Sequence, residues 1–245
     1  MQHPGEVWFL PPDAREGGDP KTRRHVLLTP CTDETEIATF AYASTQGTEA
    51  AFGAANVLLN PFATTYGSSG GTGFQQPTYI YPSRLVPAAR GDLTRFAGRI
   101  IDEMGAIRGR LQDALGIRTG TGSGQREAAG SWRGRVVRLA DAFARELGCS
   151  YGVVVTDPVY SNAQRYQTIV PVLDPDEFEP DSRDLVVTGR EWTVVVAPRL
   201  KGAWLAADMV QSVFHPTEID TWTGATADEA TMAALDTYLL HLFGL

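Results

Sequence analysis

The 245 residues include 21 Lys and Arg against 29 Asp and Glu, a formal net charge of −8, and 43% of the chain is hydrophobic. This composition is typical of a soluble globular protein and excludes a disordered chain, a fibrous chain and a globally basic nucleic-acid coat. Cys31 and Cys149 are too few for a disulfide framework or a thiolate zinc site. The N-terminus lacks the basic and apolar stretches of a signal peptide, and no apolar run approaches membrane-spanning length, so we expect a cytoplasmic protein outside any membrane.

A segment rich in glycine, serine and threonine divides the chain into near-equal halves. Residues 118–130 read RTGTGSGQREAAG and show no apolar periodicity, which predicts a flexible linker. We therefore expect one domain over residues 1–117 and a second over residues 131–245.

The first half is predicted to form short strands followed by one helix. Alternating and β-branched residues between turn residues indicate strands at residues 7–10, 26–29, 39–43, 57–59 and 79–81. A stripe of apolar residues at helical spacing then predicts a closing helix that faces the core, and its members are Ile100, Met104, Ile107, Leu111 and Leu115.

The second half has the same order of elements. Its predicted strands cover residues 136–139, 153–156, 168–172, 185–188, 193–197 and 209–213. Residues 226–229, TADE, have the form of a capping box, and apolar residues follow at helical spacing up to Phe243. Short strands followed by one helix predict a mainly β fold, with a small closed barrel and a C-terminal helix in each half.

Three landmarks indicate that the halves are a duplication. Residues 5–8, GEVW, correspond to 134–137, GRVV; residues 26–29, VLLT, to 153–156, VVVT; and residues 115–117, LGI, to 243–245, FGL. The separations of the three pairs agree within two residues, although the landmarks span almost the whole of each half. The sequence therefore predicts two fused copies of one domain, a pseudo-dimer.

At these residues the chain resembles the MazF/PemK toxin family. That family opens with Gly-[Asp/Glu]-[Ile/Val]-Trp, as residues 5–8 do, and continues with a glycine-rich charged loop and a strand led by Arg-Pro. Residues 23–30 read RRHVLLTP, so Arg23 matches the arginine and Arg24 replaces the proline. In the second half, residues 206–213, AADMVQSV, match the family's L-A-D-x-V-x-S-I. The likeness covers most of both halves except the linker and residues 61–77.

The resemblance implies SH3-like barrels with C-terminal helices that work as homodimers, here two fused barrels in one chain that is expected to be a monomer. It also implies cleavage of single-stranded RNA without a metal or cofactor, and an antitoxin protein as partner. The family's catalytic arginine and threonine fall at Arg23 and Thr45. The corresponding positions of the second half, Ser150 and Leu173, supply neither group, so one active site is expected, in the first half.

Internal attack of a 2′-OH on RNA passes through a pentavalent phosphorane that carries extra negative charge. The planar, permanently charged guanidinium of Arg23 can bridge two of its oxygens. The hydroxyl of Thr45 can donate to a phosphate oxygen, and a one-residue shift would place Ser44 there instead. His25 would share the strand face of Arg23 and is a candidate base or acid, although a structural role also fits, and Arg24 would point to the opposite face. The general base is left open.

The charge is divided unevenly between the halves. Residues 1–117 carry a net charge of −2 and residues 118–245 a net charge of −6, which favours an RNA site in the first half. The rival interpretation is a protein-binding toxin without enzymatic activity, like the gyrase-binding CcdB relatives of this fold, or a scaffold that has lost catalysis. Fold alone does not decide between them.

Overall fold

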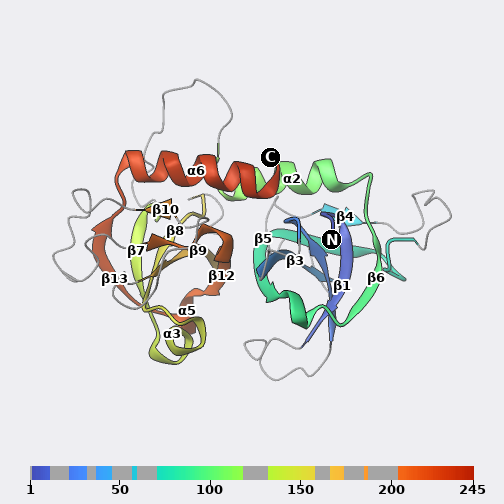
Figure 1. Cartoon of the computed structure of the whole chain (residues 1–245), viewed down its shortest axis with the longest axis horizontal. Coiled ribbons are helices and arrows are strands. Elements are labelled where there is room, and N and C mark those ends of the chain that lie inside the picture. Colours follow the sequence, from blue (N-terminus) through green and yellow to red (C-terminus); the bar gives the residue numbers. More distant parts are fainter. Residues whose placement is uncertain are drawn as a thin grey trace. The chain divides into compact units, whose positions relative to one another are not determined.

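The computed structural model describes residues 2–11, 22–31, 37–45, 57–59, 71–117, 132–157, 166–173, 185–186 and 204–245. They belong to two compact units, Met1–Leu111 and Gln112–Leu245, called unit 1 and unit 2 below. The fold is mainly β, with one antiparallel sheet in each unit and a helix after each sheet (Figure 1). The predicted linker at 118–130 and the strand predicted at 193–197 lie outside the described residues.

Unit 1 contains a six-stranded sheet in which every neighbouring pair is antiparallel, in the order β4-β5-β3-β2-β1-β6. The strands are β1 (Glu6–Leu10), β2 (Arg23–Leu27), β3 (Ile37–Ser44), β4 (Val57–Leu59), β5 (Thr78–Ala89) and β6 (Arg95–Arg99). A 3-10 turn, η2 (Arg90–Asp92), links β5 to β6. The five predicted strands are confirmed with shifted ends, whereas the sequence analysis missed β6.

Helix α2 (Met104–Ala114) follows β6. The predicted apolar stripe is buried, since none of its five members is more than 8% exposed. The helix begins at Met104, so Ile100 belongs to the chain that leads into it. The carbonyl of Ala114 accepts the backbone N–H of Asp157 at 2.9 Å.

Unit 2 contains a sheet in the order β10-β11-β9-β8-β7-β13, and β12 also pairs with β9. The strands are β7 (Arg135–Leu139), β8 (Tyr151–Val154), β9 (Tyr166–Leu173), β10 (Leu185–Val186), β11 (Trp204–Leu205), β12 (Gln211–Phe214) and β13 (Ile219–Thr226). The helical elements are α3 (Asp141–Leu147), η4 (Ala207–Met209), α5 (His215–Glu218) and α6 (Glu229–Phe243). The strand predicted at 209–213 is therefore displaced, because Met209 ends a 3-10 turn.

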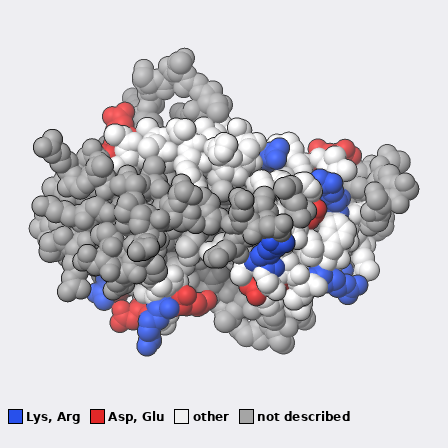
Figure 2. Space-filling model, viewed as in Figure 1, with Lys and Arg blue, Asp and Glu red and all other residues white. Residues whose placement is uncertain are grey.

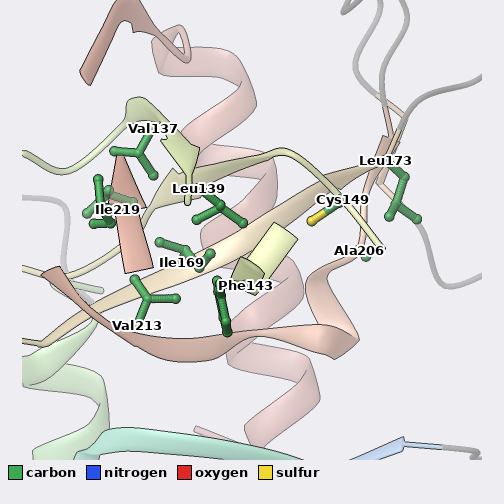
Figure 3. Close-up of a cluster of buried hydrophobic side chains, with 10 residues drawn as sticks. Val137, Leu139, Phe143, Cys149, Ile169, Leu173, Ala206, Val213 and Ile219 are labelled. Atoms are coloured by element: carbon green, nitrogen blue, oxygen red, sulfur yellow. The ribbon is translucent and has the colours of Figure 1, made fainter. Parts of the chain in front are cut away.

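The core of unit 2 draws its side chains from several strands and from one short helix (Figure 3). Ile169 of β9 lies among Val137 and Leu139 of β7, and Phe143 reaches the same cluster from α3. The sequence analysis expected only strands before the closing helix, so α3 is a correction. This helix ends at Gly148, which is in the left-handed conformation at φ +75°, where glycine is favoured.

Helix α6 is capped two residues later than the sequence predicts. The side chain of Asp228 accepts the N–H of Thr231 at 2.7 Å, whereas Thr226, the predicted cap, is the last residue of β13. The N–H of Ala227 donates to the carbonyl of Gly134 at 2.7 Å, which holds this stretch against β7 until the helix begins. In the described part of the chain, no helix, α6 included, has the length and apolar character to cross a membrane.

Two glycines of positive φ occupy similar places before β1 and β7. Gly5 has φ +91°, and a Cβ there would lie 2.4 Å from the carbonyl oxygen of Ile100. Gly134 has φ +81°, but a Cβ there would meet nothing closer than 3.6 Å.

We expect Gly134→Ala to cost about 1–2 kcal/mol because of its backbone conformation alone. Gly5→Ala adds a backbone clash, so it should cost more, on the order of 3 kcal/mol. Scanning calorimetry of the two variants measures the difference. Equal losses would show that the contact with Ile100 is relieved by a shift of the chain.

Candidate functional site

The residues that the sequence analysis selected lie where β2 begins and β3 ends. The first three residues of β2 and the last residue of β3 are Arg23, Arg24, His25 and Ser44. The pairing of these strands ends at His25 opposite Tyr42, so Arg23 lies two residues before the last pair on β2 and Ser44 two residues after it on β3. Ser44 is half-buried, and Thr45, which follows it, is exposed. The fold therefore gathers all five residues at one end of two neighbouring strands.

Arg23 and Arg24 point to opposite sides of β2. The guanidinium carbon of Arg23 lies 5.8 Å from the centre of the Tyr42 ring, on the side of β3. That of Arg24 lies 4.7 Å from the centre of the Phe9 ring of β1. Successive side chains of a strand alternate between the two faces, so only one of the two arginines shares a face with His25 and Tyr42.

His25 is only 6% exposed and is held by its neighbours. Its ring meets that of Tyr42 edge to face at 5.7 Å between centres. Its Nδ1 lies 3.2 Å from the carbonyl oxygen of Arg23, and because a carbonyl only accepts, this contact requires a proton on Nδ1. The bond ties the ring to the backbone at Arg23, which favours the structural role that the sequence analysis left open.

The sequence analysis missed Arg84, whose guanidinium carbon lies 3.9 Å from the centre of the Tyr42 ring. This is a close cation–π contact. The Tyr42 ring thus has Arg23 and Arg84 near it, from β2 and β5. The sequence signal for Arg84 is weak, because a lone arginine after a Pro-Ser pair has no periodicity.

A bulge in β5 places Arg84 there. Tyr81 is opposite Tyr42 and Leu85 is opposite Ala41, so residues 82–84 of β5 fall between two successive register pairs with β3. Such an insertion bends a strand and redirects its side chains. It is therefore the local irregularity of β5 that brings the Arg84 guanidinium onto Tyr42.

Tyr42 of β3 and Tyr79 and Tyr81 of β5 form the part of the site where these two strands pair. Tyr81 meets Tyr42 at 5.8 Å between ring centres, and Tyr79 meets Tyr81 at 6.4 Å. Tyr81 is fully buried, and burial raises the pKa of its hydroxyl to about 12, an effect reinforced by Tyr42 and Tyr79 and opposed by Arg84. Tyr81 therefore keeps its proton at neutral pH and is not a general base. The alternation of Tyr79 and Tyr81 is a signal that the sequence analysis did not use.

These rings belong to a longer row that crosses the sheet of unit 1. The register places Tyr81, Tyr42, His25, Trp8 and Phe96 opposite one another on β5, β3, β2, β1 and β6. Trp8 and Phe96 meet edge to face at 5.5 Å, and Phe96 is 49% exposed, whereas Tyr42 is 6% exposed. The row thus runs from a buried end beside the arginines to an exposed end at β6.

The visible face of unit 1 carries several Lys and Arg side chains (Figure 2). β2, β5 and β6 each carry at least one arginine, and the described arginines of these strands are Arg23, Arg24, Arg84, Arg95 and Arg99. They form two groups: Arg23 and Arg84 lie near the Tyr42 ring, whereas Arg24 and Arg95 lie near the Phe9 ring. An anionic ligand at Tyr42 would meet the positive charge of the first group.

Within the residues that the structure describes, the other potential metal ligands, nucleophiles and aromatic side chains form no cluster comparable to the one at Tyr42. Among the described residues, no group of three or more His, Cys, Asp and Glu side chains is placed to hold a metal ion. Burial raises the pKa of the Cys149 thiol to about 12, so it is not a nucleophile at neutral pH. Trp132 and Trp222 meet at 4.5 Å between centres and pack against the core of unit 2.

No protein-family model matches the sequence, and no curated protein matches it. Among solved structures, a similar chain comes from an endoribonuclease in complex with its cognate antitoxin from a mycobacterial species. The match covers 49% of this chain and 100% of that chain, with 14% sequence identity and a TM-score of 0.35. At that TM-score the likeness carries no conclusion about this chain.

The raised pKa of Tyr81 makes stability depend on pH in the alkaline range. Between pH 10 and about 12 the folded chain keeps the Tyr81 proton and the unfolded chain loses it, so stability falls as the pH rises through this window. We expect a loss of about 2–3 kcal/mol across it, which Tyr81→Phe removes. Urea unfolding of both proteins at pH 9 to 12 tests this, and parallel curves would contradict it.

Proposed function

We propose that unit 1 is a MazF/PemK-type endoribonuclease that cleaves single-stranded RNA without a metal, and that Arg23 and Thr45 act on the scissile phosphate. The observation that carries the proposal is the pair of guanidinium groups, from Arg23 and Arg84, near the ring of Tyr42, on the strand that ends at Ser44 and is followed by Thr45. Two permanent positive charges next to hydroxyl donors fit phosphodiester cleavage, in which negative charge grows in the transition state.

In the proposed reaction the 2′-OH attacks the adjacent phosphorus, the 5′-oxygen of the next nucleotide leaves, and the product ends in a 2′,3′-cyclic phosphate. Arg23 neutralises the oxygens of the phosphorane, and a guanidinium held in place needs no reorganisation as that charge forms. Thr45, or Ser44 beside it, donates a hydrogen bond from its hydroxyl to a phosphate oxygen and keeps its proton. The general base stays open, because His25 is largely buried and bonded to the backbone.

We further propose that the chain is a fused pair of SH3-like barrels, a pseudo-dimer. The two sheets have corresponding strand orders, β4-β5-β3-β2-β1-β6 and β10-β11-β9-β8-β7-β13. In unit 1, the N–H of Gly5 donates to Leu27 at 2.8 Å and its carbonyl accepts from Ile100 at 2.7 Å. In unit 2, Gly134 makes both bonds at 2.7 Å, to Val154 and from Ala227.

A pair of threonines gives the same correspondence at the next turn. Thr29 accepts the N–H of Thr39 on its hydroxyl oxygen at 2.9 Å, and Thr156 accepts that of Thr168 at 2.5 Å. The partners are 10 residues apart in unit 1 and 12 apart in unit 2. These bonds involve backbone groups that any related domain would need to satisfy, so they support descent from one domain.

Aligned on these bonds, unit 2 has lost the site. The paired residues His25 and Tyr42 correspond to Gly152 and Pro171, and Arg23 corresponds to Ser150. Leu173 corresponds to Ser44 and not, as the sequence analysis counted, to Thr45. Alignment of Thr39 with Thr168 puts the counterpart of Thr45 at position 174, outside the described residues.

A protein-binding function is the second candidate, and exposed apolar side chains in unit 1 favour it. Leu58, Phe96 and Ile101 are 52%, 49% and 66% exposed. Such residues are also suited to contact an antitoxin, which is the protein partner we propose for the ribonuclease. Fold does not separate these possibilities, but RNA cleavage does.

We expect Arg23→Ala to reduce RNA cleavage about a hundredfold or more, because it removes a fixed donor to the transition state. The assay uses a long single-stranded RNA in the presence of a chelator, with product ends checked for a 2′,3′-cyclic phosphate. Full activity of the parent in chelator is the expected result, and activity restored only by added magnesium would contradict the mechanism.

Arg24→Ala is the matched control, because Arg24 stacks on Phe9 across the strand from the site. Its effect should be much the smaller of the two. The reverse ranking would show that Arg24 serves the phosphate. If the parent cleaves no RNA, the protein-binding candidate replaces the enzyme.

We also expect the chain to be a monomer, because a duplicated barrel supplies its own partner at high effective concentration. Sedimentation at micromolar protein measures this. A tight dimer would count against the pseudo-dimer.

A further inference from the structure

We propose that Arg84 binds the phosphate next to the scissile one, so that unit 1 holds two adjacent phosphates of one RNA strand with two guanidinium groups on a single tyrosine ring. The inference rests on the proposed ribonuclease site at Arg23. It adds a substrate-positioning residue that sequence reasoning did not find.

The spacing of the two cations carries the argument. The guanidinium carbons of Arg84 and Arg23 lie 3.9 Å and 5.8 Å from the centre of the Tyr42 ring. They can therefore be no further apart than these two distances combined, an upper limit within which two neighbouring phosphates of a single strand fit. A strand whose scissile phosphate meets Arg23 has its next phosphate within reach of Arg84.

A guanidinium stacked on a ring can still bind an anion. Its contact with the ring uses the flat face of the group, whereas its N–H donors lie in the plane and point outward. The ring beneath is itself fixed, because Tyr42 lies between Tyr81 and His25 in the sheet and contacts both. Arg84 is thus held in position before the substrate arrives, which lowers the entropic cost of binding.

The surroundings of Arg84 favour a phosphate. Tyr81 is fully buried and protonated at neutral pH, so it adds no negative charge beside the guanidinium. In unit 2, the residues that correspond to the β5 bulge form η4, Ala207–Met209, in which Met209 takes the place of Arg84. Arg84 therefore occurs in the same unit as Arg23, and unit 2 has a methionine at the corresponding position.

An acidic peptide would also be attracted to two cations, but its charges are not regularly repeated. A polyphosphate backbone releases counterions in proportion to the phosphates that are neutralised, with a salt slope of about 0.7 per phosphate in a single strand. This slope reports phosphate contacts separately from catalysis.

The test uses fluorescence anisotropy with the full chain and a labelled 2′-O-methyl RNA of mixed sequence, which cannot be cleaved because its 2′-OH groups are blocked. Affinity is measured over a series of KCl concentrations. We expect Arg84→Ala to weaken binding about tenfold and to reduce the salt slope by about 0.7. Arg84→Lys should keep the slope, because it keeps the charge.

Arg24→Ala is the control, since Arg24 also stacks on an aromatic ring but on the other face of β2. Its salt slope should equal that of the parent. Equal slope losses in Arg84→Ala and Arg24→Ala would overturn the proposal, and so would a loss in Arg84→Lys as large as in Arg84→Ala. Arg84→Gln replaces the alanine variant if circular dichroism shows that the latter does not fold.

A cleavage assay on a long single-stranded RNA completes the test. Arg84→Ala should raise KM about tenfold and leave kcat within a few-fold, whereas Arg23→Ala should lower kcat. If the parent binds the probe but cleaves no RNA, the ribonuclease proposal is refuted. The salt series then decides by itself whether Arg84 binds a phosphate. A parent that binds a polyglutamate peptide but not the probe would overturn the phosphate site in favour of an acidic protein partner.

Discussion

The site of unit 1 depends on the register of β3 between β2 and β5. That register places Tyr42 opposite His25 on one side and opposite Tyr81 on the other. A shift by one residue would turn Tyr42 to the other face of the sheet and replace it with Ala41 or Ala43, which offer no ring. The Tyr42 ring is the surface on which Arg23 and Arg84 are held, so the position of both charges follows from this pairing.

The buried end of the aromatic row fixes the positions of its rings, and the other end of the row is open to solvent. Tyr42 and Tyr81 are almost completely buried, so they cannot readily turn away from the arginines. Phe96, at the far end of the row, is half exposed and packs on Trp8, whose ring N–H donates to Glu6 at 3.0 Å. The two cations at Tyr42 therefore lie at the buried end of the row, and the ring that is open to solvent lies at its other end.

The sequence predicted what depends on local periodicity and missed what depends on distant pairing. The stripe from Ile100 to Leu115 was predicted because each member lies one helical turn from the next. Arg84 and Tyr42 are far apart in the sequence, and their contact arises from a bulge that only the pairing of β3 with β5 defines. The helix at 141–147 was missed for another reason: it has only seven residues, and its core-facing residues Phe143, Ala144 and Leu147 are too few to establish a helical period in the sequence.

A comparison of the two units distinguishes the groups that hold the sheet from the side chains that form the site. The bonds that they share are made by backbone groups of glycines and by the hydroxyl oxygens of Thr29 and Thr156, which act on the backbone. Under the proposed duplication, the side chains that differ are those that do not make these bonds. Replacement of Arg23 by Ser150 leaves every one of these bonds intact. The sheet of unit 2 therefore forms without the two cations that lie near Tyr42 in unit 1, so the fold does not require them.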